Sequence, residues 1–165
     1  RWRRVMNRND DLVREPTKAT ATREQFRLLK KYLDGRHPGG GMTDMDIRDY
    51  AGMVDGSPVR TAVFEYRAGT ADEEKTPKLE AATLTDVLRD GLSMVYSFYR
   101  PELQKRSIGT FMILDHIRFA QELGLPFVYL GYWVKNSPKM GYKSDFMPLQ
   151  TFEGNSWRDL REDEL

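Results

Sequence analysis

Aromatic and basic side chains gather between positions 129 and 143, in the stretch YLGYWVKNSPKMGYK. Aromatic faces interleaved with cations can hold single-stranded nucleic acid, because bases stack on the rings and phosphates pair with the ammonium groups. The same spacing also fits a solvated basic helix that covers core aromatics. Both interpretations, a binding surface for a large anion and the aromatic end of a core, stay open on spacing alone.

The order of residues within this stretch divides it in two. Tyr129 and Tyr132 cannot both point into a core on the alternation of a strand, and Trp133 follows where the strand should leave the sheet. Lys139 and Lys143 are four residues apart, so a short helix would present both ammonium groups on one side, with Tyr142 beside them. If the stretch is a binding surface, Tyr129–Trp133 would be its cleft wall and the lysines its anion-facing edge.

A second candidate anion site lies in PELQKRSIGT, directly before a long helix predicted at about residues 107–123. A helix N-terminus carries unpaired N–H groups and about half a positive charge, so a phosphate binds there readily. Arg106, Ser107 and Gly109 are the candidate phosphate-binding residues. A plain helix N-cap by Ser107 is the alternative.

The two histidines have different expected roles. His37, in the loop RHPGGGM, could accept a proton or orient a donor, since an unperturbed imidazole is mostly neutral at pH 7; packing within the loop is the alternative. His116 falls at the edge of the apolar face of the long helix and is predicted to be a satisfied core histidine. Asp115 is predicted to be a solvated charge on the polar face of that helix.

Composition limits the function classes. There are 26 Lys and Arg against 25 Asp and Glu, a formal net charge of +1, so any anion site must be local. With no cysteine and two histidines, neither a disulfide scaffold nor an ordinary zinc site can be built, and we expect no metal. No apolar run approaches the ~20 residues needed to span a bilayer, so a cytoplasmic location is expected.

The pattern of elements predicts an α+β fold with a mainly antiparallel central sheet and flanking helices. Strands predicted at residues 59–67, 79–88 and 92–100 form an antiparallel meander, and a fully apolar strand at 126–133 reads as central and buried. The remaining predicted elements are a strand-like run at 1–15, helices at 22–33, 43–54, 107–123 and 137–143, and a strand at 146–152. Thr22 and Gln25 have the spacing of a capping box, Thr43 is the expected cap of the second helix, and Gly124 is expected to end the long helix. This order resembles the acetyltransferase-like (GNAT) fold, although Phe111 departs from the small residue that ends the phosphate loop of that fold.

Several uncommon strings carry a family resemblance. The segment FYRPELQKRSIGTFMILDHIRFAQELGLPFVYLGYWVKNSPKMGYKSDFMPLQ resembles the C-terminal domain of the aminoacyl-tRNA–protein transferases. The strings YLDGRHPGGGM and RVMNRNDDL are similar to the bacterial branch, the aspartate/glutamate leucyltransferases. The cysteine-containing N-terminal region of that family has no counterpart here, so we expect residues 1–165 to be one domain of a longer protein. Asp145 stands where the family usually has a basic residue.

The resemblance implies an enzyme that moves an amino acid, leucine in this branch, from aminoacyl-tRNA to the N-terminal amine of proteins beginning with Asp or Glu, marking them for N-end rule degradation. An aminoacyl ester is already activated, so no cofactor, metal or nucleophilic side chain is expected. Candidate catalytic residues are His37 and Tyr132. Candidate substrate-binding residues are Arg36, Tyr129, Trp133 and Tyr142, and candidate tRNA-binding residues are Arg106, Ser107, Gly109, Lys139 and Lys143. An arginyl transferase, an acyl-CoA N-acyltransferase and a non-catalytic RNA- or degron-binding module are the alternatives.

Overall fold

The computed structural model describes residues 1–36, 39–69, 77–137 and 140–164. The chain divides into two compact units, Arg1–Tyr129 and Leu130–Leu165, which are described separately below. The prediction of one domain over residues 1–165 stays a prediction. Within the described ranges, none of the helices is both long and apolar enough to span a lipid bilayer.

The first unit is built on a five-stranded sheet whose strands follow the chain order β1-β2-β3-β4-β5. Neighbours from β1 to β4 pair antiparallel, and β5 pairs parallel to β4. The predicted meander and the α+β class are therefore confirmed. The strands are β1 (Leu12–Lys18), β2 (Thr61–Ala68), β3 (Lys78–Val87), β4 (Gly91–Tyr99) and β5 (Phe127–Tyr129).

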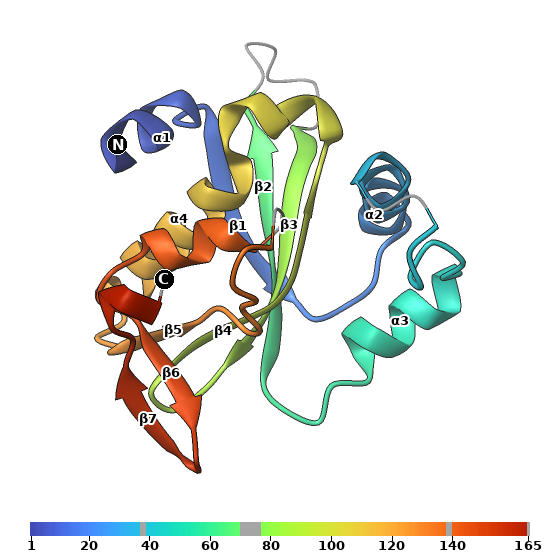
Figure 1. The fold of residues 1–165 in the computed structure, drawn as a ribbon. Coiled ribbons are helices and arrows are strands. Elements are labelled where there is room, and N and C mark those ends of the chain that lie inside the picture. Colours follow the sequence, from blue (N-terminus) through green and yellow to red (C-terminus); the bar gives the residue numbers. More distant parts are fainter. Residues whose placement is uncertain (37–38, 70–76, 138–139, 165) are drawn as a thin grey trace. The chain divides into compact units, whose positions relative to one another are not determined.

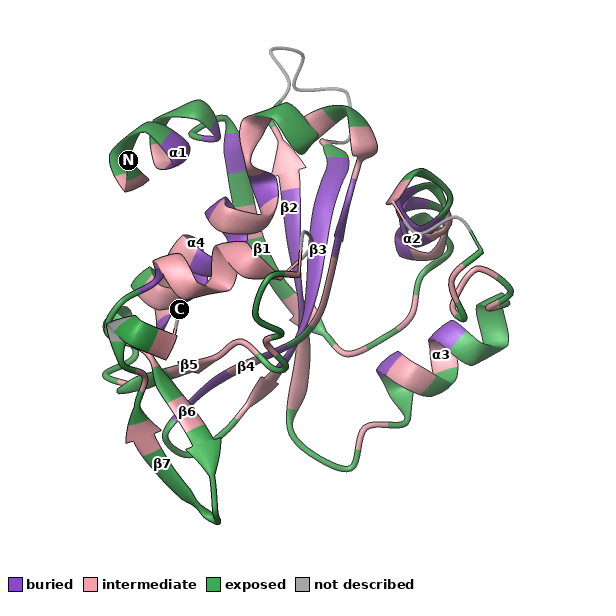
Figure 2. Cartoon of the chain, in the orientation of Figure 1, coloured by how far each residue is buried: buried purple, intermediate pink, exposed green. Residues whose placement is uncertain are grey.

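Helices cover both faces of this sheet (Figure 1). Alternation along β2 explains the two layers, because Phe64 packs against His116 and Phe119 of one layer while the next residue, Glu65, bonds to Gln25 of the other. Figure 2 shows the buried residues concentrated along β3 and the middle of β2, between the layers. The first layer holds α1 (Trp2–Arg8) and α4 (Ile108–Glu122), and the second holds α2 (Arg23–Arg36) and α3 (Ile47–Asp55).

The helix starts on the second layer follow from capping. The Thr22 hydroxyl accepts from the Gln25 N–H at 3.1 Å and the Gln25 side chain accepts from the Thr22 N–H at 3.1 Å, the predicted capping box. For α3 the predicted cap at Thr43 is wrong. Asp46 caps the helix instead, because its carboxylate reaches the N–H groups of Arg48 and Asp49.

Two strand predictions in the first unit are wrong. The basic run at the start of the chain forms α1, because Val5 and Asn9 repeat at helical spacing and both are buried. The apolar strand predicted at 126–133 shrinks to the three residues of β5, at the edge of the sheet and with Phe127 42% exposed. Its long apolar run looked central, but β4 is the one strand that pairs with it in the described part of the chain.

In the second unit, the strand predicted at 146–152 is confirmed only at its end, and the described part of the helix predicted at 137–143 contains the start of a 3₁₀ turn. A hairpin joins its two strands through Gly154 and Asn155, both with positive φ (58° and 66°), as a two-residue type I′ turn requires. The described elements are a 3₁₀ turn η2 (Gly141–Asp145), β6 (Gln150–Glu153), β7 (Ser156–Asp159) and η3 (Glu162–Glu164).

Candidate functional site

The predicted phosphate loop connects β4 to α4 through a 3₁₀ helix, η1 (Pro101–Arg106). Ser107 follows in a left-handed conformation (φ 57°) and occupies the N-cap position of α4, as the alternative predicts, but its side chain makes no cap hydrogen bond. Gly109 lies in the first turn of α4, where backbone N–H groups lack intrahelical partners. Phosphate binding at this loop stays a prediction.

Arg106 is held by a carboxylate. Its guanidinium forms an ion pair with Asp11, with Nη1 donating to Oδ2 at 3.1 Å, and its carbonyl accepts from the Asn9 amide at 3.1 Å. The Arg106 side chain is 24% exposed and that of Asp11 is 49% exposed. A phosphate at this loop would have to displace Asp11, and the role of Arg106 in binding one stays a prediction.

The end of α2 is anchored beside this loop. A Cβ at Gly35 would lie 3.0 Å from the ring of Pro101, so the helix approaches η1 closely at a residue without a side chain. Arg36, the last residue of α2, is half-buried. Burial raises the pKa of Tyr99, and the positive charge of Arg36 opposes that rise. The candidate residues His37 and Lys139 lie outside the described residues.

The edge strand β5 is fitted to β4 by a glycine and ends early. A Cβ at Gly91 would lie 2.5 Å from the Phe127 carbonyl oxygen, so a side chain there would push β5 away. The two strands pair from Gly91 to Ser93 only, and among the described residues no strand continues this pairing along Met94–Tyr99. A register shift opposite Leu84 and Thr85 leaves Val95 as the extra residue of β4, a bulge that turns the strand at this point.

The aromatic segment begins with Tyr129, the last residue of β5, and continues into the second unit. The Tyr129 hydroxyl donates to the Asp90 carboxylate at 2.8 Å, and burial together with this bond raises the pKa of Tyr129. In the second unit, Tyr132 is 90% exposed, whereas Trp133 is half-buried. Gly131 between β5 and Tyr132 has a φ of +71°, which favours glycine and turns the chain there.

Lys143 has a structural position that the sequence did not predict. Its ammonium donates to the carbonyl oxygens of Leu130 at 2.6 Å and Tyr132 at 2.8 Å, and burial lowers its pKa. These bonds hold the backbone on either side of Gly131. Tyr142, beside it, is half-buried. Whether Lys143 or Tyr142 also contacts a substrate stays a prediction.

The prediction that Asp115 is a solvated helix charge is wrong. Its side chain is 2% exposed and accepts from Arg14 Nη1 at 3.0 Å, from the Tyr66 hydroxyl at 3.0 Å and from Arg118 Nη2 at 2.8 Å. The guanidinium of Arg14 also lies 4.1 Å from the centroid of the Phe119 ring. Nothing in the local pattern of α4 signals this network, because Arg14 is 101 residues away on β1.

His116 is the buried, satisfied histidine that the sequence predicts. Nδ1 lies 2.8 Å from the Met112 carbonyl, so it carries the proton, and Nε2 accepts from the Thr85 hydroxyl at 2.9 Å. Burial lowers its pKa to about 4. Both nitrogens of this neutral imidazole are hydrogen-bonded within the core, so His116 is not available to a substrate.

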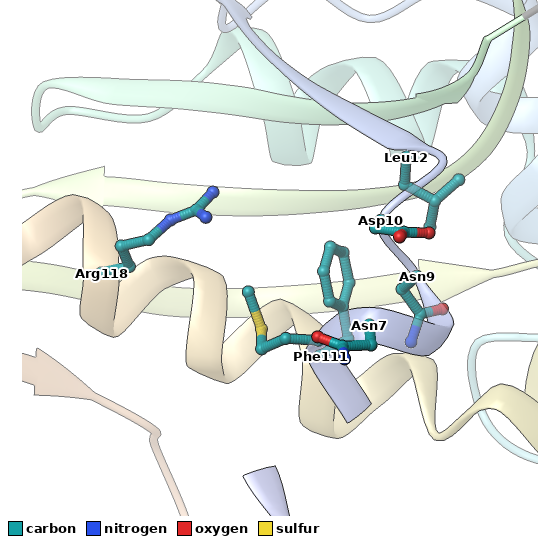
Figure 3. Close-up of a pocket in the computed structure, with 7 residues that line it drawn as sticks. Asn7, Asn9, Asp10, Leu12, Phe111 and Arg118 are labelled. Atoms are coloured by element: carbon teal, nitrogen blue, oxygen red, sulfur yellow. The ribbon is translucent and has the colours of Figure 1, made fainter. Parts of the chain in front are cut away.

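The first unit also has a pocket of about 290 Å³ between α1, β1 and α4 that sequence reasoning missed. Figure 3 shows Arg118 at one side of it and Asp10 with Asn9 at the other, with the Phe111 ring between them. Phe111, the residue that departs from the phosphate-loop pattern, is therefore a wall of this pocket. The lining residues are Met6, Asn7, Asn9, Asp10, Leu12, Phe111 and Arg118.

Comparison with known proteins decides the family. The profile of the family described as "Arginine-tRNA-protein transferase, C terminus" matches residues 24–153, most of the chain. The chain belongs to this family. The resemblance inferred from strings such as YLGYW and KMGYK is thereby confirmed, and the phosphate loop, β5 and the aromatic segment all lie within the matched part of the arginine-tRNA-protein transferase family.

Curated relatives within this family cover nearly the whole chain. A Hyphomonas neptunium protein is 59% identical over 162 residues, 98% of this chain and 63% of its own length. Proteins of a Jannaschia species and of Afipia carboxidovorans are 52% and 53% identical over 96% and 94% of this chain and 54% and 62% of their own lengths. All three are named aspartate/glutamate leucyltransferase. The chain therefore spans somewhat more than half the length of these relatives.

Proposed function

We propose that this chain is the part of a cytoplasmic aminoacyl-tRNA–protein transferase that carries the acyl-transfer fold, with leucine as the donor amino acid and proteins beginning with Asp or Glu as acceptors. The observation that carries the proposal is the identity of 59% over 98% of the chain to a protein named aspartate/glutamate leucyltransferase. Acceptors modified in this way would enter N-end rule degradation.

The strand order supports an acetyltransferase-like fold. An antiparallel β1–β4 meander followed by a helix crossover to a parallel β5 brings the loop before α4 and the end of β5 to one sheet. Where β5 leaves β4, alternate backbone N–H groups of Met94–Tyr99 have no strand partner among the described residues. Such donors suit the oxyanion that forms when an amine attacks an ester carbonyl.

The proposed reaction needs little side-chain chemistry. The neutral α-amine of the acceptor attacks the carbonyl carbon of the aminoacyl ester, a C–N bond forms and the C–O bond to the tRNA ribose breaks. The amine proton passes to the departing ribose oxygen, which leaves as a hydroxyl group. An α-amine with a pKa near ~7.7–8.0 keeps an appreciable neutral fraction at neutral pH, so positioning and oxyanion stabilisation carry most of the work.

The candidate residues divide the remaining work. The backbone of Ser107 and Gly109, with Arg106, would bind a phosphate near the tRNA 3′ end. Tyr132, 90% exposed, would offer a face for base stacking, which is worth about 1–3 kcal/mol per base. Arg36 would pair with the acidic side chain of the acceptor, since a guanidinium binds carboxylate in two-point fashion.

Transfer of labelled leucine from charged tRNA tests the proposal. The assay compares a peptide that begins with Asp with the same peptide beginning with Ala, using this chain and the Hyphomonas neptunium relative with its matching residues replaced by this chain. We expect label on the Asp peptide alone. Equal labelling of both peptides would remove the acceptor specificity, and no labelling with either protein would remove the activity.

An arginyl donor is the second candidate, because the family description itself names arginine. The same assay with arginyl-tRNA separates the two donors, and transfer of arginine in place of leucine would move the assignment. Binding of acetyl-coenzyme A is a further check. Tight binding would favour an acyl-CoA transferase, which the bulk of Phe111 beside the loop disfavours.

A further inference from the structure

Helix α1 exposes a row of arginines. Arg3, Arg4 and Arg8 are all exposed, while Val5 of the same helix is buried. Neither Arg3 nor Arg4 forms an ion pair with any residue in the described ranges. Asp10 is the one carboxylate among the first ten residues. The helix is thus an exposed, locally cationic surface.

Two hydrogen bonds fix this helix to the loop before α4. Arg8 Nη1 donates to the Lys105 carbonyl at 3.0 Å, and the Asn9 amide donates to the Arg106 carbonyl at 3.1 Å. Lys105, itself exposed and without an ion pair among the described residues, is therefore brought to the end of α1. We call the four side chains of Arg3, Arg4, Arg8 and Lys105 the α1 ridge.

Several other arginines of the first unit are paired with carboxylates. The guanidinium groups on the sheet and on α4 reach carboxylates, with contacts from 2.6 to 3.1 Å at Arg67, Arg100 and Arg118. The chain as a whole carries a formal charge of only +1. Arg3 and Arg4 lie close together on one short helix and have no carboxylate partner within the described part of the molecule, so an external anion is a favourable partner for them.

The geometry points to nucleic acid: we infer that the α1 ridge binds the phosphate backbone of the aminoacyl-tRNA. This inference rests on the proposed function for the identity of the RNA. Three of the four cations are guanidinium groups, which suit phosphate through two parallel hydrogen bonds. Arg4 and Arg8 are one helical turn apart and so lie along one face, as contact with successive phosphates requires.

The ridge is also joined to the candidate phosphate loop by chain connection and by hydrogen bonds. Lys105 and the Arg106 carbonyl belong to the residues that lead directly into the first turn of α4. An RNA strand on the ridge would therefore continue toward the loop proposed to hold the phosphate near the reacting end. The ridge would set affinity and register for the RNA and would take no part in bond making.

The test is tRNA binding by the chain with Arg3→Ala and Arg4→Ala combined, measured by fluorescence anisotropy between 50 and 200 mM salt. Each phosphate contact contributes about 0.7–0.9 to the slope of log K against log salt, so the slope should fall by between one and two and the affinity by roughly tenfold at low salt. The double lysine variant, R3K with R4K, should keep most of the slope because it keeps the charge.

The matched control is Arg48→Ala with Arg60→Ala, which removes two exposed arginines from the opposite layer and from the start of β2. We expect its slope and affinity to equal those of the unaltered chain. Urea unfolding checks that every variant folds. In transfer assays the α1 variant should raise KM for leucyl-tRNA roughly tenfold and leave kcat and KM for the peptide unchanged.

Each other outcome overturns the inference. Equal affinity and slope for R3A/R4A and the unaltered chain would show that the ridge does not touch RNA, while leucine transfer by the same protein would leave the proposed function standing. Binding of heparin as tight as binding of tRNA would show a general polyanion surface. Absence of any tRNA binding by the unaltered chain would remove the ridge as a binding surface, and the labelling assay would then decide the function separately.

Discussion

Removing the Asp115 carboxylate should be one of the most damaging single changes to the first unit. The carboxylate is 2% exposed, and the Arg14 side chain that donates to it is 15% exposed. Tyr66, whose pKa is raised by burial and by the nearby carboxylate, donates to the same oxygen at 3.0 Å. Asp115→Ala removes the carboxylate acceptor of the Tyr66 hydroxyl and leaves Arg14 with only the backbone carbonyl of residue 115 at 3.3 Å and the exposed Glu122 carboxylate at 3.4 Å.

The expected cost follows from that burial. Breaking a buried ion pair by removing one partner typically costs about 3–5 kcal/mol, because the remaining charge stays desolvated. Glu122→Ala removes the neighbouring carboxylate, which is 52% exposed and lies 3.4 Å from Arg14, and an exposed pair is worth about 0–1 kcal/mol. Glu122→Ala is therefore the matched control.

Equilibrium urea unfolding measures both variants. We expect Asp115→Ala to lower the free energy of unfolding by at least three times as much as Glu122→Ala. For a chain of this size each kcal/mol corresponds to roughly 2–4 °C in Tm, so a thermal scan should show a fall of about 6–20 °C. A loss below about 1 kcal/mol would refute the view that the buried Arg14 guanidinium depends on the Asp115 carboxylate.

Three further changes test other positions. Lys143→Met removes the donor to two carbonyls, so backbone hydrogen exchange across residues 130–134 should accelerate; unchanged exchange would show that the ammonium does not hold this segment. His116 has a pKa of about 4 in the folded protein and ~6.5 in the unfolded chain, so below pH 6.5 the unfolded chain binds the extra proton. The free energy of unfolding should therefore fall by up to about 1.4 kcal/mol for each unit by which the pH is lowered from 6.5 to 4. A His116→Gln variant with the same pH dependence would contradict this. Gln25→Leu removes one donor to the buried Glu65 carboxylate, which keeps Arg67, and the acceptor of the buried Tyr50 hydroxyl. It should cost about 1–3 kcal/mol in urea unfolding, against little for the exposed Gln121→Leu; equal losses would be inconsistent with the buried network.

Local sequence signals predicted the elements that local physics controls. The capping box of Thr22 and Gln25, the β2–β3–β4 meander and the buried His116 all follow from periodicity and short-range chemistry. Gly124, predicted to end the long helix, has the positive φ (68°) of that position.

The errors arise where distant residues decide the outcome. Asp115 lies among polar neighbours on the helix and looks solvated until Arg14, 101 residues earlier, is placed against it. The run at 126–133 is apolar enough for a central strand. Its place at the edge of the sheet depends on the strands that precede it and on the bulge at Val95 of β4. Periodicity along one segment carries neither kind of information.

The same limit applies to the cations of the candidate site. The sequence does not distinguish them, whereas the structure shows that they have different partners. Arg106 pairs with Asp11, half exposed, in a contact of the kind worth about 0–1 kcal/mol, so a backbone phosphate, with its single negative charge, can compete for it at small cost. Lys143 donates to two backbone carbonyls from a partly buried position, and releasing it would leave both carbonyls to find new donors. Arg3 and Arg4 have no carboxylate to leave among the described residues. An arriving RNA should therefore engage α1 first, then exchange Asp11 for phosphate at Arg106, while Lys143 keeps the aromatic segment in place.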